Sequence, residues 1–387
     1  MKYCALCCIA KDEDLFLKEW IAYHALIGVE HFYIYDDISS LPIVDLLAGW
    51  SNSSSVTVIR NDRQRDQNFV YNNCLQSFGH EAQWIGFLDV DEFIRITPPE
   101  SERPDIRLFL AEFESYAGLG LNWRMFSSSG HESTPPGPVI GNYTRCMGDN
   151  IHIKSIVQPA KTRECAGAHS FYPQNGEYAA NAAGFPIPPG FPFSPPATAK
   201  ASVNHYFYKS RECFAHKVAK GNPCHIERRM EEFDRHLSQT DEPDLRLTPY
   251  AKQVASQLAG ENGSLRKATP PKPFPGEEAP VDGPSHLAAA CRYFAQNNLR
   301  QALLHTCYAA MHLNRDSEAD PAHKMELWTL RAEIAMRHKD LPLAERCIRQ
   351  ALIHHAGHRT FTLWAELLLQ SGRLEESKAV TRILQHY

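Results

Sequence analysis

The segment Trp84-Ile-Gly-Phe-Leu-Asp-Val-Asp-Glu-Phe93 places three carboxylates directly after a short apolar run. Such a run is typical of a strand that is buried in a sheet. Asp89 and Asp91 are two positions apart, so in an extended chain their side chains project to the same side and can share one hard cation. A solvated acidic turn is the alternative, because Asp-x-Asp tripeptides are common. The segment predicts a strand end that carries a metal site.

The sequence before this segment alternates between strand-like and helix-like patterns. Apolar runs predict strands, and apolar spacings of three and four predict helices. The predicted strands are 3–10, 31–35, 56–59 and 84–88, and the predicted helices are 16–27, 43–50 and 66–78. Parallel strands are joined by helical crossovers because a tight hairpin cannot connect them. We therefore predict an α/β domain with a mostly parallel sheet, in which ligands bind beyond the carboxyl ends of the strands.

The composition describes an ordinary folded protein. Of 387 residues, 43% are hydrophobic and 22% are charged, which indicates two or three globular domains. A net charge of -5 gives no basic footprint for nucleic acid. The longest apolar run near the start, Cys4–Ala10, is far shorter than the roughly 20 residues of a membrane span. The 11 scattered cysteines fit a reducing compartment. We expect a cytoplasmic protein, or one peripheral at the inner membrane.

The last third of the chain differs from the rest. Residues 261–284 are rich in Pro, Gly and Glu and predict a linker, and residues 285–387 predict helices. Leu299, Leu341 and Leu374 are each followed by a small residue three positions on, a period that resembles tetratricopeptide helix pairs. A generic helical bundle is the alternative. We expect an all-α, repeat-like domain that binds a protein partner or a second copy of the chain.

A second proline-rich stretch, Phe185–Pro196, lies inside the first domain. Its missing backbone donors exclude a helix or a central strand. We predict a long loop over the surface.

Several sequence blocks occur in a fixed order over residues 1–225. They are Glu19-Trp-Ile-Ala-Tyr-His24, Ile27-Gly-Val-Glu-His-Phe-Tyr-Ile-Tyr-Asp36, Leu88-Asp-Val-Asp-Glu-Phe93, Asn122–His131, Lys154-Ser-Ile-Val157 and Asn204-His-Tyr206. In this order they resemble glycosyltransferase family 92 and the family 2-like nucleotide-sugar glycosyltransferases of bacteria. The resemblance implies a single Rossmann-like nucleotide-sugar domain of the GT-A type, to which we assign residues 1–260.

The resemblance implies a metal site at Asp89 and Asp91, completed by His205. A divalent metal acts as a Lewis acid that neutralises the departing nucleoside diphosphate. Oxygen ligands favour Mg²⁺ or Mn²⁺, and an imidazole ligand favours Mn²⁺. A core or surface histidine is the alternative for His205.

The resemblance also implies a donor-binding rim. Its members are charged or amide side chains at the carboxyl ends of the strands or in the later blocks. Lys154 and Lys217 are expected at the diphosphate, Asp36 or its competitor Asp37 at the uridine, Gln67 at the base, and Lys11 and Glu13 on the same rim. For Glu13 the alternative is a favourable charge at a helix N-terminus.

The acceptor side is less well defined by the sequence. Trp123 is expected to stack on a sugar ring, with a core tryptophan as the alternative, and His131 is expected to bind acceptor hydroxyls. Transfer with inversion needs a general base, for which Glu132 and Glu164 are candidates.

Together these features predict a metal-dependent enzyme of the hexosyltransferase class. It moves a sugar from a nucleotide donor, expected to be UDP-linked, to a glycan or lipid-linked acceptor. The alternative is a transferase-like scaffold without turnover that acts through its helical tail.

Overall fold

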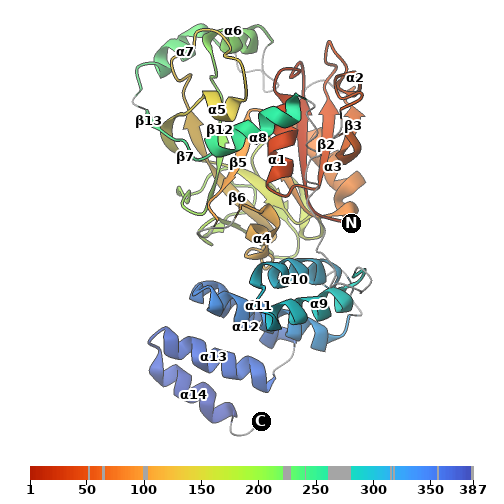
Figure 1. Cartoon of the computed structure of the whole chain (residues 1–387), viewed down its shortest axis with the longest axis vertical. Helices are drawn as coiled ribbons and strands as arrows, with labels where there is room; N and C mark the ends of the chain where they lie inside the picture. The colour runs from red at the N-terminus through yellow and green to blue at the C-terminus, as the bar shows by residue number, and fades with distance from the viewer. Residues whose placement is uncertain are drawn as a thin grey trace. The chain divides into compact units, whose positions relative to one another are not determined.

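A computed structural model describes residues 1–50, 53–62, 66–98, 103–220, 228–239, 241–259, 280–313, 316, 319–354 and 357–384 (Figure 1). The chain divides into two compact units. One unit comprises residues 1–109 with 116–268, and the other comprises residues 110–115 with 269–387. Residues 261–279 of the predicted linker lie outside the described residues, and helix α9 begins at Gly283.

The first unit opens with the predicted parallel strands. They are β1 (Lys2–Ala10), β2 (His31–Asp36), β3 (Val56–Arg60) and β4 (Ala82–Phe87), joined through α1 (Leu17–Leu26), α2 (Ile43–Leu46) and α3 (Gln67–Phe78). The strands lie in the order β3-β2-β1-β4, and all three pairings are parallel. Asp66 caps α3 by accepting a hydrogen bond from the Phe69 amide at 2.9 Å. The predicted α/β fold is confirmed.

Beyond β4 the sheet becomes mixed. The further elements are β5 (Glu92–Ile96), α4 (Ile106–Ala111), β6 (Gly118–Phe126), α5 (Val139–Asn142), β7 (Arg145–Val157), β10 (Ala179–Asn181), β11 (Pro186–Ile187), β12 (Ala201–His205), α6 (Arg211–Lys220), α7 (Met230–His236), β13 (Glu242–Pro243) and α8 (Thr248–Leu258). Strand β7 is antiparallel to β4 and β6, whereas β12 is parallel to β6 and antiparallel to β5. Strands β8 (Thr162–Cys165) and β9 (Phe171–Pro173) pair separately.

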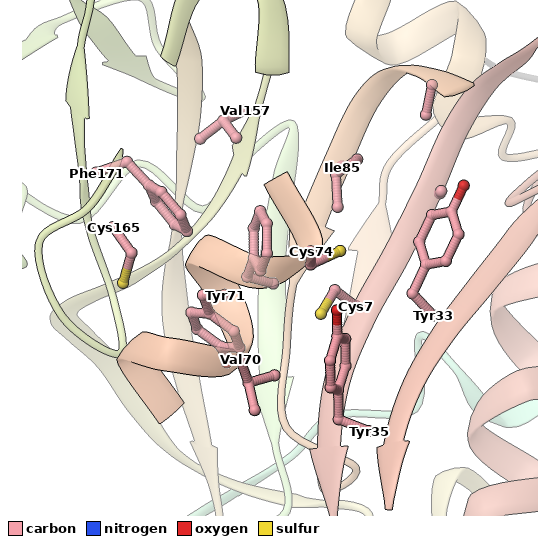
Figure 2. Close-up of a cluster of buried hydrophobic side chains, with 13 residues drawn as sticks. Cys7, Tyr33, Tyr35, Val70, Tyr71, Cys74, Ile85, Val157, Cys165 and Phe171 are labelled. Atoms are coloured by element: carbon pink, nitrogen blue, oxygen red, sulfur yellow. The ribbon is translucent and has the colours of Figure 1, made fainter. Parts of the chain in front are cut away.

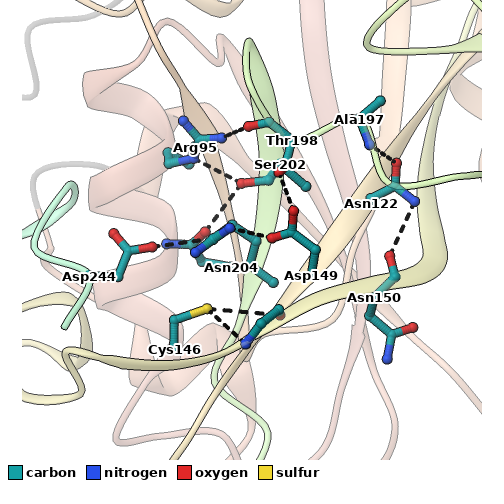
Figure 3. Close-up of polar contacts among 12 residues, drawn as sticks. Arg95, Asn122, Cys146, Asp149, Asn150, Ala197, Thr198, Ser202, Asn204 and Asp244 are labelled. Atoms are coloured by element: carbon teal, nitrogen blue, oxygen red, sulfur yellow. Dashed lines mark hydrogen bonds and ion pairs between the residues drawn. The ribbon is translucent and has the colours of Figure 1, made fainter. Parts of the chain in front are cut away.

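The prediction of a surface loop over Phe185–Pro196 is wrong in part. The stretch begins with β11, which pairs with β10 at the edge of the sheet, where a missing proline donor is tolerated. Farther along, Ser194 is buried and its amide bonds to the Ile151 carbonyl at 2.9 Å. The Asn122 side chain donates to the Ser194 carbonyl and accepts from the Ala197 amide, as the contacts around Asn122 in Figure 3 illustrate in part. This stretch is therefore anchored to β6 and β7.

Helix α3 covers one face of the parallel strands. Figure 2 shows its Cys74 beside Cys7 of β1, and its Val70 and Tyr71 belong to the same buried cluster as Cys7 and Tyr35 of β2. Burial raises the pKa of the Cys7 thiol well above its usual value, so the thiol stays protonated. All the cysteines that the structure describes are free thiols.

Helix α1 fixes β5 from the other side. The Trp20 indole donates to the Glu92 carbonyl at 2.9 Å, and the Tyr23 hydroxyl donates to the Ile94 carbonyl at 2.7 Å. His24 donates from Nδ1 to the Trp20 carbonyl and accepts at Nε2 from the Ile94 amide. Burial lowers the pKa of His24 to about 3, so its imidazole is neutral. The Glu-Trp-x-x-Tyr-His block is thus the support of the strand that follows the acidic segment.

The second unit is helical, as predicted. Its helices are α9 (Gly283–Ala295), α10 (Leu299–Leu313), α11 (Pro321–Arg337), α12 (Leu341–His354), α13 (His358–Gln370) and α14 (Leu374–Leu384). Each helix packs on its successor, and the first helices of the three pairs begin at Gly283, Pro321 and His358. The tetratricopeptide likeness stays a prediction. Within the described part of the chain, no helix combines the length and the apolar composition that a membrane crossing requires.

One ion pair is enclosed in this helical unit. Arg331 of α11 and Glu114 form a bidentate pair, and their side chains are 2% and 0% exposed. The Arg331 guanidinium also donates to the Thr306 hydroxyl and carbonyl, both at 3.1 Å. The segment 110–115 is therefore part of the helical unit, although it lies far from the helices in the sequence.

Candidate active site

The acidic segment forms a hydrogen-bonded turn between β4 and β5. The Asp89 amide donates to the Glu92 carboxylate at 2.8 Å, and the Glu92 amide donates to the Asp89 carbonyl at 3.1 Å. The Tyr206 amide donates to the Asp91 carbonyl at 2.9 Å, which ties the turn to the end of β12. These backbone contacts hold the carboxylates at the carboxyl end of β4 independently of any ligand.

Asp89 is paired with a buried lysine. Lys154 Nζ lies 2.9 Å from Asp89 Oδ2 and 3.4 Å from Glu92 Oε2, and the Lys154 side chain is 0% exposed. Asp89 is 39% exposed and also accepts from Gln67 Nε2 at 3.2 Å. Burial raises the pKa of Asp89, but the charge and hydrogen bond of Lys154, together with His205, bring the net pKa below the usual value. Asp89 is therefore a carboxylate that reaches solvent.

Asp91 is paired with a second lysine and a histidine. Lys217 Nζ lies 2.6 Å from Asp91 Oδ2, and His205 Nε2 lies 3.5 Å from Asp91 Oδ1. Burial opposes ionisation of Asp91, yet the Lys217 ammonium and the hydrogen bond from His205 hold the pKa of this carboxyl well below its usual value. Burial lowers the pKa of His205, so the imidazole is neutral at physiological pH. Its Nδ1 is buried and has no hydrogen-bond partner among the described residues.

Glu92 belongs to the same cluster, a role that the sequence did not assign. Its side chain is fully buried, and burial raises the pKa of the carboxyl well above its usual value. Its Oε2 accepts from the Asp89 amide, whereas Oε1 has no partner within the described chain. Two buried polar atoms of the cluster, Glu92 Oε1 and His205 Nδ1, are thus left open, which is uncommon in protein interiors.

A group of aromatic rings adjoins the acids. The Trp123 ring lies 4.4 Å from His205, 5.1 Å from His152 and 5.0 Å from His169, measured between centroids. His152 stacks on one face of the indole at an angle of 21°. Trp123 is partly exposed, so it is not fully buried in the core. Because His152 covers one face of the indole, the ring is not a free platform for a sugar either. The sequence did not single out His152 or His169, because they approach Trp123 only through the pairing of distant strands.

The remaining donor-side residues have other contacts. Both Asp36 oxygens accept backbone amides, from Ser39 at 2.9 Å and Ile43 at 3.0 Å, so this side chain shapes the loop after β2. The Asp37 carboxylate accepts a hydrogen bond from the side-chain amide of Asn61 at 2.9 Å. Lys11, between β1 and α1, is partly exposed.

Glu13 extends the charged rim. It pairs with Lys220 at 2.7 Å, on the same helix α6 as Lys217. Helix α6 therefore supplies two lysines to this rim, because Lys217 pairs with Asp91 and Lys220 pairs with Glu13.

Apart from Trp123, the predicted acceptor-side residues have partners outside the acidic turn. His131 Nε2 lies 3.2 Å from the Asn142 carbonyl, and the His131 ring packs edge-on against Tyr143. Glu132 pairs with Arg211 at 3.0 Å, and Glu164 pairs with Arg163 at 2.9 Å. None of these pairs involves a residue of the acidic turn.

The side chains at the turn suit a divalent metal that is completed by its substrate. Among the described residues, no three His, Cys, Asp or Glu side chains converge as a closed metal-binding group. Mg²⁺ ordinarily uses one or two protein carboxylates and takes its other ligands from phosphate oxygens and water. Asp89 and Asp91 match this requirement, and the unpartnered Nδ1 of His205 is a further open position.

The sequence profile of glycosyltransferase family 92 matches residues 4–242, which include the whole acidic cluster. The chain belongs to this family. A family 92 protein of Ricinus communis is 28% identical over 221 residues, which cover 55% of this chain and 36% of that protein. A family 92 protein of Oryza sativa subsp. japonica is 28% identical over 155 residues, or 40% of this chain and 26% of that protein. The chain thus spans only about a quarter to a third of the length of these relatives.

Two further similarities concern named proteins. The galactan beta-1,4-galactosyltransferase GALS2 of Arabidopsis thaliana is 31% identical over 110 residues, which cover 26% of this chain and 21% of that protein. The crystal structure of S. aureus TarS 1-349 in complex with UDP overlaps with a TM-score of 0.33 at 13% identity, covering 80% of this chain and 91% of that one. The profile match over residues 4–242 confirms the predicted family.

Proposed function

We propose that this chain is a metal-dependent glycosyltransferase of the hexosyltransferase class that uses a nucleotide sugar, UDP-linked, and a glycan or lipid-linked acceptor, with inversion. The observation that carries the proposal is the pair Asp89 and Asp91 at the carboxyl end of a parallel strand, in a chain of family 92. A relative named as a galactan galactosyltransferase supports a hexosyl donor and a glycan acceptor.

In this proposal Asp89 and Asp91 hold Mn²⁺ or Mg²⁺, and His205 completes the site. The metal supplies Lewis-acid stabilisation of the charge that develops on the departing diphosphate. The backbone of the turn and of Tyr206 keeps both carboxylates in place before the donor arrives. Preorganised groups of this kind stabilise a transition state without a cost of reorganisation.

The two lysines have different parts in the proposal. Lys217 is 23% exposed and can exchange its contact with Asp91 for a diphosphate oxygen. Lys154 is fully buried between Asp89 and Glu92, so it sets the charge of the acids from inside the protein. Gln67 orients Asp89 through its amide and also donates to the Tyr71 hydroxyl at 2.7 Å.

We assign the transfer chemistry to residues 1–260 and partner binding to the helices of residues 285–387, with residues 261–284 as the connection. The free thiols favour a reducing compartment such as the cytoplasm. The competing function is a scaffold without turnover that acts through the helical tail.

The deciding experiment measures sugar transfer and donor hydrolysis by the full chain with a panel of nucleotide sugars in Mn²⁺, Mg²⁺ or excess chelator. We expect turnover with a UDP-hexose and its loss with chelator or in Asp89→Asn. The control is Asp234→Asn, which alters an exposed carboxylate paired with Arg211 and should keep full activity. Turnover that survives both chelator and Asp89→Asn would contradict metal dependence, and no turnover with any donor would favour the scaffold.

A further inference from the structure

We propose that His169 is the general base that deprotonates the acceptor hydroxyl; this inference rests on the proposed function. Glu132 and Glu164 already have arginine partners, and neither contacts a residue of the acidic turn. An inverting transfer still needs a proton acceptor at the reacting hydroxyl. The geometry around Trp123 supplies one.

The backbone holds His169 from both sides. Ser155 donates its hydroxyl to the His169 carbonyl at 2.6 Å, and His169 Nδ1 lies 2.9 Å from the Ile153 carbonyl. These two anchors flank Lys154, whose ammonium contacts Asp89. The short connection between β8 and β9 is therefore fastened to β7 at the level of the acidic turn.

This fastening determines the tautomer of His169. A carbonyl oxygen can only accept, so Nδ1 must carry the proton and Nε2 must present its lone pair. Within the described chain, Nε2 has no hydrogen-bond partner, and the side chain is partly exposed. A base that is oriented by a second hydrogen bond is the usual arrangement of a catalytic imidazole.

The protonation state agrees with this role. The pKa of His169 is lowered to about 4, first by burial and then by the Lys154 ammonium. The hydrogen bond to the Ile153 carbonyl raises this pKa by less than Lys154 lowers it. The imidazole is therefore neutral at physiological pH and about as basic as an ordinary carboxylate. The Trp123 ring lies 5.0 Å from the His169 ring and 4.4 Å from the His205 ring, measured between centroids, and His205 in turn lies 3.5 Å from Asp91.

His152 provides the internal comparison. Its Nδ1 lies 2.8 Å from Asn150 Oδ1, so it can adopt the same tautomer, and its ring also contacts Trp123. Burial alone accounts for the lowered pKa of His152, without an effect of Asp89 or Lys154. His152 thus shares the contact with Trp123, but its Nδ1 meets the Asn150 side chain, whereas Nδ1 of His169 meets the Ile153 carbonyl beside Lys154.

The transfer step balances with this assignment. The acceptor oxygen forms a bond to the anomeric carbon as the bond from that carbon to the diphosphate oxygen breaks. The diphosphate leaves with the electron pair of that bond. The hydroxyl proton passes to His169 Nε2, and the imidazolium then returns it to water.

The test uses the full chain with the donor found in the transfer assay. His169→Asn keeps an N–H for the Ile153 carbonyl and removes the Nε2 lone pair, and His152→Asn is the matched control. We expect kcat to fall about 100-fold or more in His169→Asn, with an unchanged donor Kd by calorimetry, and to stay within about threefold in His152→Asn. Added imidazole should restore part of the turnover in His169→Gly.

The outcomes separate the two proposals. A wild-type protein that turns over no donor overturns the proposed function. If the wild-type protein is active and His169→Asn keeps its kcat, only the assignment of His169 is overturned. The same holds if kcat falls only in Glu132→Gln or in Glu164→Gln. If His169→Asn fails to bind the donor, His169→Gln is measured instead, and a donor-binding His169→Gln with full kcat overturns the assignment.

Discussion

The Glu114–Arg331 pair of the helical unit and the acid–lysine pairs beside β4 each include a buried side chain, yet their exposure and hydrogen bonding differ. Arg331 also donates to the Thr306 hydroxyl and carbonyl, and the side chains of Arg331 and Glu114 are almost fully buried. At β4, Asp89 reaches solvent, and Glu92 Oε1 and His205 Nδ1 have no partner among the described residues. A closed network of this kind stabilises the fold, whereas an open one has capacity for a ligand.

The closed network should give the largest loss of stability when it is broken. Glu114→Ala leaves the Arg331 charge buried, which typically costs about 3–5 kcal/mol of unfolding free energy. Urea unfolding followed by circular dichroism measures the loss. Glu114→Met with Arg331→Met removes both charges and should recover most of the stability. If Glu114→Ala were as stable as wild type, water would have to replace the carboxylate as a hydrogen-bond partner of the Arg331 guanidinium.

The two lysines at β4 should divide between stability and activity. Lys154→Met should cost about 2 kcal/mol of stability, less than Glu114→Ala, because Asp89 is 39% exposed and water can replace the lysine. Lys217→Met should leave the urea midpoint nearly unchanged and raise the donor Kd, since Lys217 is partly exposed. Equal losses of stability in both variants would contradict the distinction between them.

The pH dependence of stability should report a second closed network, at His24. Its folded pKa of about 3 lies below the unfolded value of about 6.5, so its contribution is complete above pH 6.5 and is lost as the pH falls toward 3. Between pH 7 and pH 4.5 we expect a loss on the order of 2–3 kcal/mol from this group. In His24→Gln, unfolding free energy measured against pH should have a smaller slope. An unaltered slope would assign the acid sensitivity to other groups.

An exposed pair should give the smallest effect. Lys378 and Glu375 lie 2.8 Å apart with 52% and 80% of their side chains exposed. Such pairs often contribute nothing measurable, so Lys378→Ala should keep the urea midpoint of wild type within error. A clear shift would mean that the distance between charges, and not their burial, governs these networks.

Much of the fold could be predicted from the sequence because its signals are local. The apolar runs of β1, β2 and β4 and the helical spacing of α1 are visible within single segments. The acidic turn could also be placed, since it directly follows an apolar run. Lys154, Lys217 and His205 were found only through the resemblance, and the structure places all three beside the acids.

The parts that could not be predicted depend on distant pairings. His169 meets Lys154 and Trp123 only because Ser155 and Ile153 hold its loop, and no local pattern marks that contact. Glu132 and Glu164 were favoured by residue type, but their arginine partners depend on the folded chain. Asp36 was expected at a nucleotide, whereas both of its oxygens accept backbone amides.

The membership of residues 110–115 in the helical unit has a consequence for synthesis of the protein. Arg331 follows Glu114 by 217 residues, which a ribosome adding 5–20 residues per second needs about 10–40 s to translate. The segment must stay available through that interval, so the buried pair can form only after α11 has been synthesised. A gene fragment that begins after the linker encodes the helices without the carboxylate that Arg331 is buried against.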